Sequence, residues 1–237
     1  MSAFLYGIGL QFRMDIRSRS LLVTCYLVPL MFFAVMGGIF TSLMPEAKET
    51  LTASMTVMGV SMGALIGVPP SLVEIYGTEV KKMYHAGGAP QCFGLAALIF
   101  SSFVHLMIMS GILLLAAPVM FDARIPSNIL VYLVKLAFFL VVSLALACVL
   151  GLSVKSQAKL TMLCQVAFLP SILLSGIMFP AELLPDFLEQ AGRIFPAYWG
   201  YRLLAGMGSW SENTFSMILI FLVTVILAVF FVRRQDV

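Results

Sequence analysis

Long apolar segments alternate with short polar ones along the chain. A helix needs about 20 apolar residues to cross the hydrocarbon core of a bilayer. The segments are rich in Leu, Met and Ala and do not alternate strictly, which favours helices over strands. Six of them qualify, at residues 21–43, 51–72, 93–120, 128–152, 161–180 and 214–232. We therefore predict an all-α, polytopic membrane protein with six transmembrane helices.

The composition excludes a soluble domain. Hydrophobic residues make up 61% of the 237 residues and charged residues 11%, whereas soluble domains carry about 25% charged residues. We predict one transmembrane domain over 1–237. Within it, 1–20 is expected to be an interfacial helix, 73–91 a cytoplasmic loop and 181–210 a set of extracellular re-entrant helices.

The first twenty residues have the pattern of an amphipathic helix that lies in the membrane surface. Apolar residues recur every four positions at Phe4, Ile8, Phe12 and Ile16. Charged residues fall on other faces, at Arg13, Asp15, Arg17 and Arg19. No basic residue precedes the apolar part, so a signal peptide is not indicated. A frayed polar leader is the alternative to an interfacial helix.

The placement of basic residues sets the orientation. With both termini in the cytoplasm, the inner segments hold nine Lys and Arg residues and the outer segments four, while Lys135 lies within the fourth span. Trp199 and Trp210 then lie at the outer interface, as aromatic belts require. We expect a multi-pass protein of the plasma membrane, meaning the cytoplasmic or inner membrane, with cytoplasmic termini.

The four cysteines are expected to stay reduced. Cys25, Cys92, Cys148 and Cys164 have no paired spacing and lie near the cytoplasmic side in this topology. We expect no disulfide, no metal site and no cofactor.

The second span carries three glycines on one helical face. Gly59, Gly63 and Gly67 are spaced four residues apart, and such a groove lets another helix approach closely in lipid. The face could pack inside one subunit, form a dimer seam or line a substrate cavity.

The loop after Pro69 and Pro70 contains a short charged segment. Residues 78–86 can form a helix that ends at Gly87 and Gly88. Either a docking element or a solvated loop fits its charges. Its sequence lacks the glycine and lysine spacing of a phosphate-binding loop.

His105 is the only ionisable residue deep within a span. Such residues are functional candidates by default, although a neutral histidine hydrogen-bonded to a neighbouring helix also fits. No Asp or Glu lies in the core of a predicted span. A carboxylate proton relay and an intramembrane hydrolase are therefore poor fits.

The end of the fifth span is repeatedly broken. The breaking residues are Pro170, Ser175, Gly176, Pro180, Pro185 and Pro196. The thirty or so residues that follow are too apolar for a free loop and too broken for a span. Broken helices at membrane depth are tolerated where they are buried in protein or line a cavity. We expect a re-entrant hairpin that caps a pathway from outside, with a surface-resting loop as the alternative.

These features together resemble one known family, the membrane subunit (permease) of type-2 ATP-binding-cassette (ABC) exporters. The resemblance covers nearly the whole chain. It is carried by the amphipathic first helix and by three stretches, "EIYGTEVKKMYHAGGAP" (74–90), "LLSGIMFPAELLP" (173–185) and "FPAYWGYRLLAG" (195–206).

The resemblance implies six helices per subunit and a dimer around a central path. It implies that residues 78–86 form the coupling helix, which sits in a groove of the ATPase subunit, and that the helices of 180–206 form the extracellular gate. The expected coupling residues are Glu74, Gly77, Thr78, Glu79, Lys81, Lys82, Tyr84 and His85. In the family a basic residue usually follows the acidic one, whereas Ile75 follows Glu74 here.

Because the sequence holds no nucleotide-binding motif, active export would need a separate ATP-binding subunit. We expect a non-enzymatic permease that exports a drug, a peptide antibiotic or a lipid-like amphiphile. Its expected partners are that subunit, a second permease (identical or different) and membrane lipids, with no nucleic acid. The alternatives are an exporter of glycans or lipid-linked polysaccharides, a secondary transporter, and a membrane scaffold without transport activity.

Overall fold

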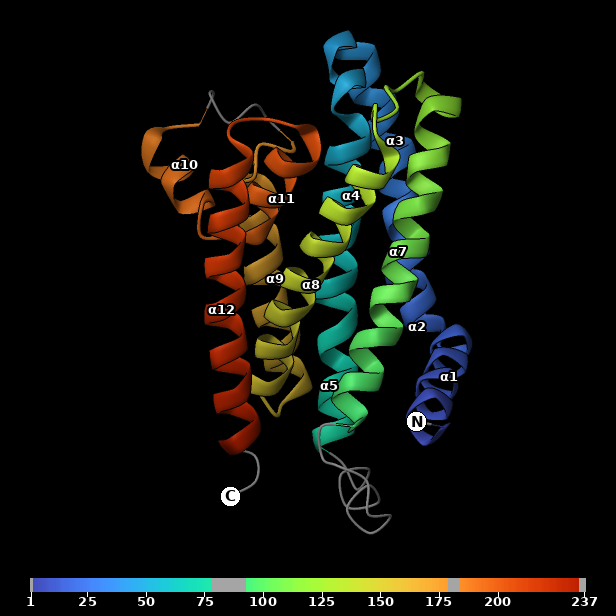
Figure 1. Cartoon of the computed structure of the whole chain (residues 1–237), viewed down its shortest axis with the longest axis vertical. Coiled ribbons are helices and arrows are strands. Elements are labelled where there is room, and N and C mark those ends of the chain that lie inside the picture. Colours follow the sequence, from blue (N-terminus) through green and yellow to red (C-terminus); the bar gives the residue numbers. More distant parts are fainter. Residues whose placement is uncertain (1, 78–92, 179–183, 235–237) are drawn as a thin grey trace.

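The computed structural model describes residues 2–77, 93–178 and 184–234, and all regular elements in these ranges are helical. The long helices run along one axis (Figure 1). In chain order the elements are α1 (Ser2–Arg17), α2 (Arg19–Leu22), the π-helical turn η1 (Val23–Leu27), α3 (Val28–Leu43), the 3₁₀ helix η2 (Pro45–Glu49), α4 (Leu51–Met62), the π-helical turn η3 (Gly63–Gly67), α5 (Val68–Gly77), α7 (Phe93–Phe121), α8 (Ile129–Ser153), α9 (Gln157–Leu173), α10 (Asp186–Gly192), α11 (Pro196–Ala205) and α12 (Trp210–Arg234). The all-α prediction is confirmed for these residues.

Five helices of the described chain are long and apolar enough to cross a membrane. They are Val23–Leu43, Leu51–Ile75, Phe93–Phe121, Ile129–Ser153 and Trp210–Arg233. Each lies within a few residues of a predicted span. The predicted span 161–180 contains α9, which has 17 residues and is shorter than the other five. Five spans are therefore supported, and the sixth stays a prediction.

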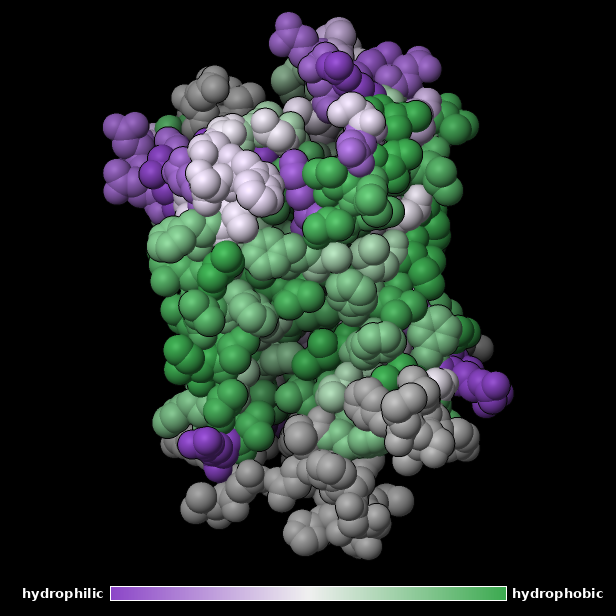
Figure 2. Space-filling model, in the orientation of Figure 1, coloured by the Kyte–Doolittle hydropathy of each residue, from purple (hydrophilic) through white to green (hydrophobic). Residues whose placement is uncertain are grey.

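On the face that Figure 2 shows, apolar residues cover the middle of the bundle, and polar residues gather toward its two ends. The helix Leu51–Ile75 lies at the centre, with 83% of its most apolar stretch buried inside the chain. The corresponding value for Trp210–Arg233 is 11%, so the outer helix presents its side chains to the surroundings. A surface of this kind suits lipid, because hydrocarbon solvates apolar side chains and leaves no need to cover them.

The two π-helical turns each precede prolines. Pro29 follows η1, and Pro69 and Pro70 follow η3. Proline has no N–H to donate to the carbonyl four residues earlier and its ring crowds that carbonyl, so the helix rearranges one turn before it. The backbone stays helical through both turns, and the two turns contact one another.

The glycine face of the central helix packs inside this chain. A Cβ on Gly59 would lie closer than 3.0 Å to the side chain of Met109, and one on Gly63 equally close to Leu106. At Gly67 the nearest atom would be the Cys25 Sγ, 3.3 Å away. The three glycines thus allow α7 and η1 to approach the backbone of the central helix.

The segment around α10 and α11 lies at the end of the bundle opposite to the start of α1 and the end of α12 (Figure 1). Gly176 follows α9 with a φ of +82°, and Gly206 ends α11 with a φ of +72°. Both values lie in the left-handed region that favours glycine. After Gly206, the Met207 N–H donates to the Arg202 carbonyl (2.8 Å) and closes the end of α11.

Candidate functional site

A cavity of about 660 Å³ opens between α11 and the corner where α3 ends and α4 begins. This volume lies within the range of about 300–1,000 Å³ that small-molecule pockets occupy. The residues that line it are Phe40, Met44, Pro45, Glu46, Ala47, Thr50, Ser54, Ser175, Gly176, Ile177, Met178, Glu189, Tyr198, Tyr201, Arg202 and Met207. They come from the α3–α4 corner, the end of α9, and α10 with α11.

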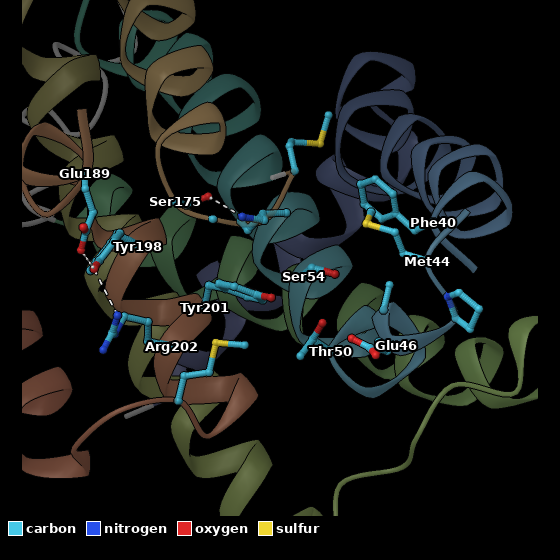
Figure 3. A pocket seen from close by; sticks show the side chains of 16 residues that line it. Phe40, Met44, Glu46, Thr50, Ser54, Ser175, Glu189, Tyr198, Tyr201 and Arg202 are labelled. Atoms are coloured by element: carbon cyan, nitrogen blue, oxygen red, sulfur yellow. Dashed lines mark hydrogen bonds between the residues drawn. The ribbon is translucent and has the colours of Figure 1, made fainter. Parts of the chain in front are cut away.

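One side of the cavity gathers oxygen atoms. Figure 3 shows the hydroxyls of Thr50, Ser54 and Tyr201 beside the carboxylate of Glu46. Thr50 caps the start of α4, Ser54 lies one turn later, and Tyr201 reaches across from α11. Burial raises the pKa of Tyr201, and the nearby Thr50 hydroxyl partly offsets the rise. The result is a set of hydrogen-bond acceptors from three elements.

The other side is a hydrogen-bonded network that ties α10 to α11. Glu189 Oε1 accepts hydrogen bonds from Arg193 Nη2 and from the Tyr198 hydroxyl, both at 3.0 Å. Those bonds, Arg193 first, hold the pKa of Glu189 below its ordinary value. Arg202 Nη1 donates to the Tyr198 hydroxyl (3.2 Å), and Trp199 Nε1 donates to the Arg193 carbonyl (2.7 Å). The two short helices therefore form one unit.

The remaining walls of the cavity are apolar. They are formed by Phe40, Met44, Ile177, Met178 and Met207. Unbranched Met side chains adapt their shape to what lies against them. A cavity with one polar side and flexible apolar walls can hold an amphiphilic molecule.

A second polar cluster lies between α1 and α7, at the other end of the bundle. Asp15 is only 4% exposed. Its Oδ2 accepts a short hydrogen bond from the Ser101 hydroxyl, and its Oδ1 accepts one from Gln11 Nε2 (2.8 Å). Ile16, which belongs to the predicted apolar stripe of this helix, is 47% exposed. The sequence interpretation placed Asp15 on a polar face away from the apolar stripe, whereas the structure turns it inward, because Ser101 offers it a donor.

His105 lies in the same cluster. Its Nδ1 is hydrogen-bonded to the Tyr26 hydroxyl (2.8 Å), and its ring stacks on Phe12 with centroids 4.5 Å apart. Its Nε2 is buried and has no hydrogen-bond partner in the part of the chain that is described. The two partners of His105 come from α1 and η1. This arrangement matches a histidine hydrogen-bonded to a neighbouring helix.

Most of the predicted coupling segment lies outside the described residues. Glu74 and Gly77 belong to the last turns of α5, and Glu74 is exposed. Thr78, Glu79, Lys81, Lys82, Tyr84 and His85 fall in the range 78–92, which the structure does not describe. Cys92 falls in the same range, while Cys25, Cys148 and Cys164 are buried free thiols.

The residues predicted for the gate divide into two groups. Ser175 and Gly176 line the cavity. Pro170 lies inside α9, Pro185 precedes α10 and Pro196 begins α11, and none of the three lines the cavity. Pro180 lies outside the described residues.

Several cavity residues escaped the sequence interpretation. Glu46, Thr50 and Ser54 look like an ordinary polar corner between two spans, and only the fold brings them against Tyr201. Tyr198 and Tyr201 recur three residues apart on an apolar helix, which signals a shared face. The spacing of the two tyrosines does not reveal which residues form the opposite wall of the cavity.

No curated protein matches the chain. A family model described as "ABC-2 type transporter" matches residues 3–208, which include α1, all the helices through α11 and every residue that lines the cavity. This match confirms the resemblance seen in the sequence, and it agrees with an all-helical bundle whose long apolar helices mark a membrane protein. The chain therefore belongs to the ABC-2 type transporter family.

Proposed function

We propose that this chain is the permease subunit of an ABC exporter and that the cavity is the outer part of its transport path. The observation that carries the proposal is the amphiphilic cavity beside the broken region after α9, where Ser175 and Gly176 meet Tyr201. Irregular backbone at the edge of a membrane is expected where it lines such a space. In this proposal α10 and α11 form the re-entrant gate.

The basic residues support one side of the membrane for each end of the bundle. Seven of the described Lys and Arg residues lie at the end that holds the start of α1 and the end of α12, and four lie at the other end. The proposed cytoplasmic end is therefore that of α1 and the end of α12, and the cavity faces out of the cell. A substrate bound there is at the exit of an export path in the plasma membrane.

The energy would come from a partner. Permeases of this family normally work with an ATP-binding subunit. We place the contact at residues 78–86, with Glu74 and Gly77 of α5 leading into it, and we place a second permease beside the first around a common path. Motion of the ATP-binding subunits would then move rigid helices and open the gate.

The favoured substrates are drugs, peptide antibiotics and lipid-like amphiphiles. The apolar side chains that line the cavity support an amphiphile over a glycan, which would need polar contacts along its whole length. His105 contacts α1 and η1 in the other polar cluster, so its proposed role is to hold the first helix and not to contact substrate.

The test is ATP-dependent uptake of a fluorescent amphiphile into inside-out vesicles that hold the permease and its ATP-binding subunit. Combined replacement of Lys81, Lys82 and Tyr84 by Ala should abolish uptake while the chain still inserts. The control replaces Lys155 and Lys159, two exposed lysines near the start of α9, and should keep vanadate-sensitive uptake. Uphill transport by the permease alone would contradict the proposal, as would full uptake by the first variant.

A further inference from the structure

Glu46 carries a charge that its neighbourhood does not balance. In the two outer connections, 44–50 and 122–128, Lys48 pairs with Asp122 (3.7 Å) and Arg124 with Glu49 (3.2 Å). The Glu46 side chain forms no hydrogen bond or ion pair with any residue that the structure describes. Both connections are fully described, so one negative charge remains, and it lies at the wall of the cavity.

The groups next to Glu46 are hydrogen-bond acceptors. Ser54 gives its hydroxyl proton to the Leu51 carbonyl (3.0 Å), which leaves the lone pairs of its oxygen free. Thr50 and Tyr201 place two more hydroxyl oxygens on the same side of the cavity. A hydroxyl oxygen has two acceptor sites, and a carboxylate accepts only. The ring of Tyr201 adds a face that attracts a cation.

One nitrogen of the basic side chain of the cavity is engaged away from Glu46, while its Nε has no hydrogen-bond partner among the described residues. Arg202 donates to the hydroxyl of Tyr198, and its guanidinium lies 5.5 Å from the centroid of that ring. Its charge also acts on Glu189 and helps to keep the pKa of that carboxyl low. Of the charged residues that line the cavity, Glu189 pairs with Arg193 (3.0 Å) and Arg202 donates to Tyr198, whereas Glu46 has no charged partner among the described residues. The side of the cavity that holds Glu46 therefore favours a cation over an anion.

We infer that the cavity recognises an amphiphile that carries a protonated amine, with Glu46 as the recognising charge. The inference rests on the proposed role of the cavity as a substrate site. The ammonium group lies among Glu46, Thr50, Ser54 and Tyr201, where its N–H groups find acceptors. The alkyl or aromatic part lies against the apolar walls.

The experiment measures binding to the purified full-length chain in phosphatidylcholine nanodiscs. The probes are dodecylammonium, dodecanol and dodecanoate, which share one alkyl chain and differ in charge. Binding is followed by the fluorescence of Trp199 and Trp210, the two tryptophans of the chain. Partition of each probe into the lipid is the same for every variant, so the difference between variants isolates the site.

We expect the chain to bind dodecylammonium about fivefold more tightly than dodecanol, because a partly exposed ion pair contributes up to about that factor. Glu46→Gln should remove the preference and leave dodecanol binding unchanged. Glu49→Gln is the matched control, since Glu49 lies on the same 3₁₀ helix, pairs with Arg124 and does not line the cavity. Equal binding of dodecanoate, or a preference that survives Glu46→Gln, overturns the inference.

A parallel uptake assay separates this inference from the proposed function. If ATP drives uptake of amphiphiles but binding does not depend on Glu46, the substrate class is wrong and the transport function stands. If Glu46-dependent binding is found while ATP drives no transport, the site stands and the transport function fails.

Discussion

The contact between Ser101 and Asp15 allows a sharp test of how the first helix is held. Asp15 is a buried carboxylate that accepts two side-chain hydrogen bonds, one from Gln11 on its own helix and one from Ser101 on α7. Of the two, only the bond from Ser101 joins the helices. Ser101→Ala removes that donor and leaves the carboxylate buried with a single partner.

The expected effect of Ser101→Ala on the opening of α1 follows from the burial and charge of Asp15, which accepts the hydrogen bond. A hydrogen bond to a charged group contributes about 1.5–3 kcal/mol, because the alternative is a desolvated charge without a donor. A change of about 1.4 kcal/mol is a tenfold change in an equilibrium constant. The opening of α1 away from α7 should therefore become roughly tenfold to a hundredfold more frequent in Ser101→Ala.

Hydrogen–deuterium exchange of the amides of α1, followed in the purified protein, measures this opening. Ser102→Ala is the matched control. The Ser102 hydroxyl is buried in the same helix, one residue along, and has no partner among the described residues. Its loss should leave the exchange of α1 unchanged and should not destabilise the protein. Equal exchange of α1 in both variants would refute the assigned role of Asp15.

Two further predictions concern α11 and α10. Gly200→Ala should destabilise the protein by about 1–3 kcal/mol, because the new methyl group would overlap the ring of Phe139. Thermal unfolding measures this loss of stability. The control is Gly111→Ala, which should be neutral or slightly stabilising because the space around Gly111 is open. Glu189, whose pKa is lowered by its partners, should stabilise the contact between α10 and α11 fully above pH 4.5 and lose this effect as the pH falls through its lower folded-state value. The fluorescence of Trp199 should report that loss below pH 4.5 in the native protein, and Glu189→Gln should show no such transition.

The long helices could be predicted because lipid imposes a simple rule on sequence. A span must satisfy its backbone within itself and stay apolar for about 20 residues, so composition and length are enough to find it. The helix Ile129–Ser153 differs from its predicted segment, 128–152, by one residue at each end. The end of α9 is harder to predict from the sequence, because Pro170 and Gly176 lie close to it and the apolar pattern continues beyond the helix.

The two polar sites could not be predicted in the same way, because their members come from distant parts of the chain. Ser101 and Asp15 are 86 residues apart, and Tyr26 and His105 are 79 apart. In the cavity, Tyr201 meets Thr50 across most of the sequence. Local periodicity carries no information on such pairs, since it reports the face of one helix and not which helix covers that face.

A constraint within the sequence could still have narrowed the search for the partners of His105. Ser101 and His105 lie one turn apart on one face of a span, and burying a polar group without a partner costs free energy. The predicted spans contain no carboxylate, so an acidic partner for this face has to come from a segment at the membrane surface. Asp15 belongs to such a segment, α1, which is long enough to lie along α7 as a helix. The same reasoning explains why Ile16 faces outward: once the carboxylate turns in, the residue beside it turns toward lipid, where an apolar side chain needs no partner.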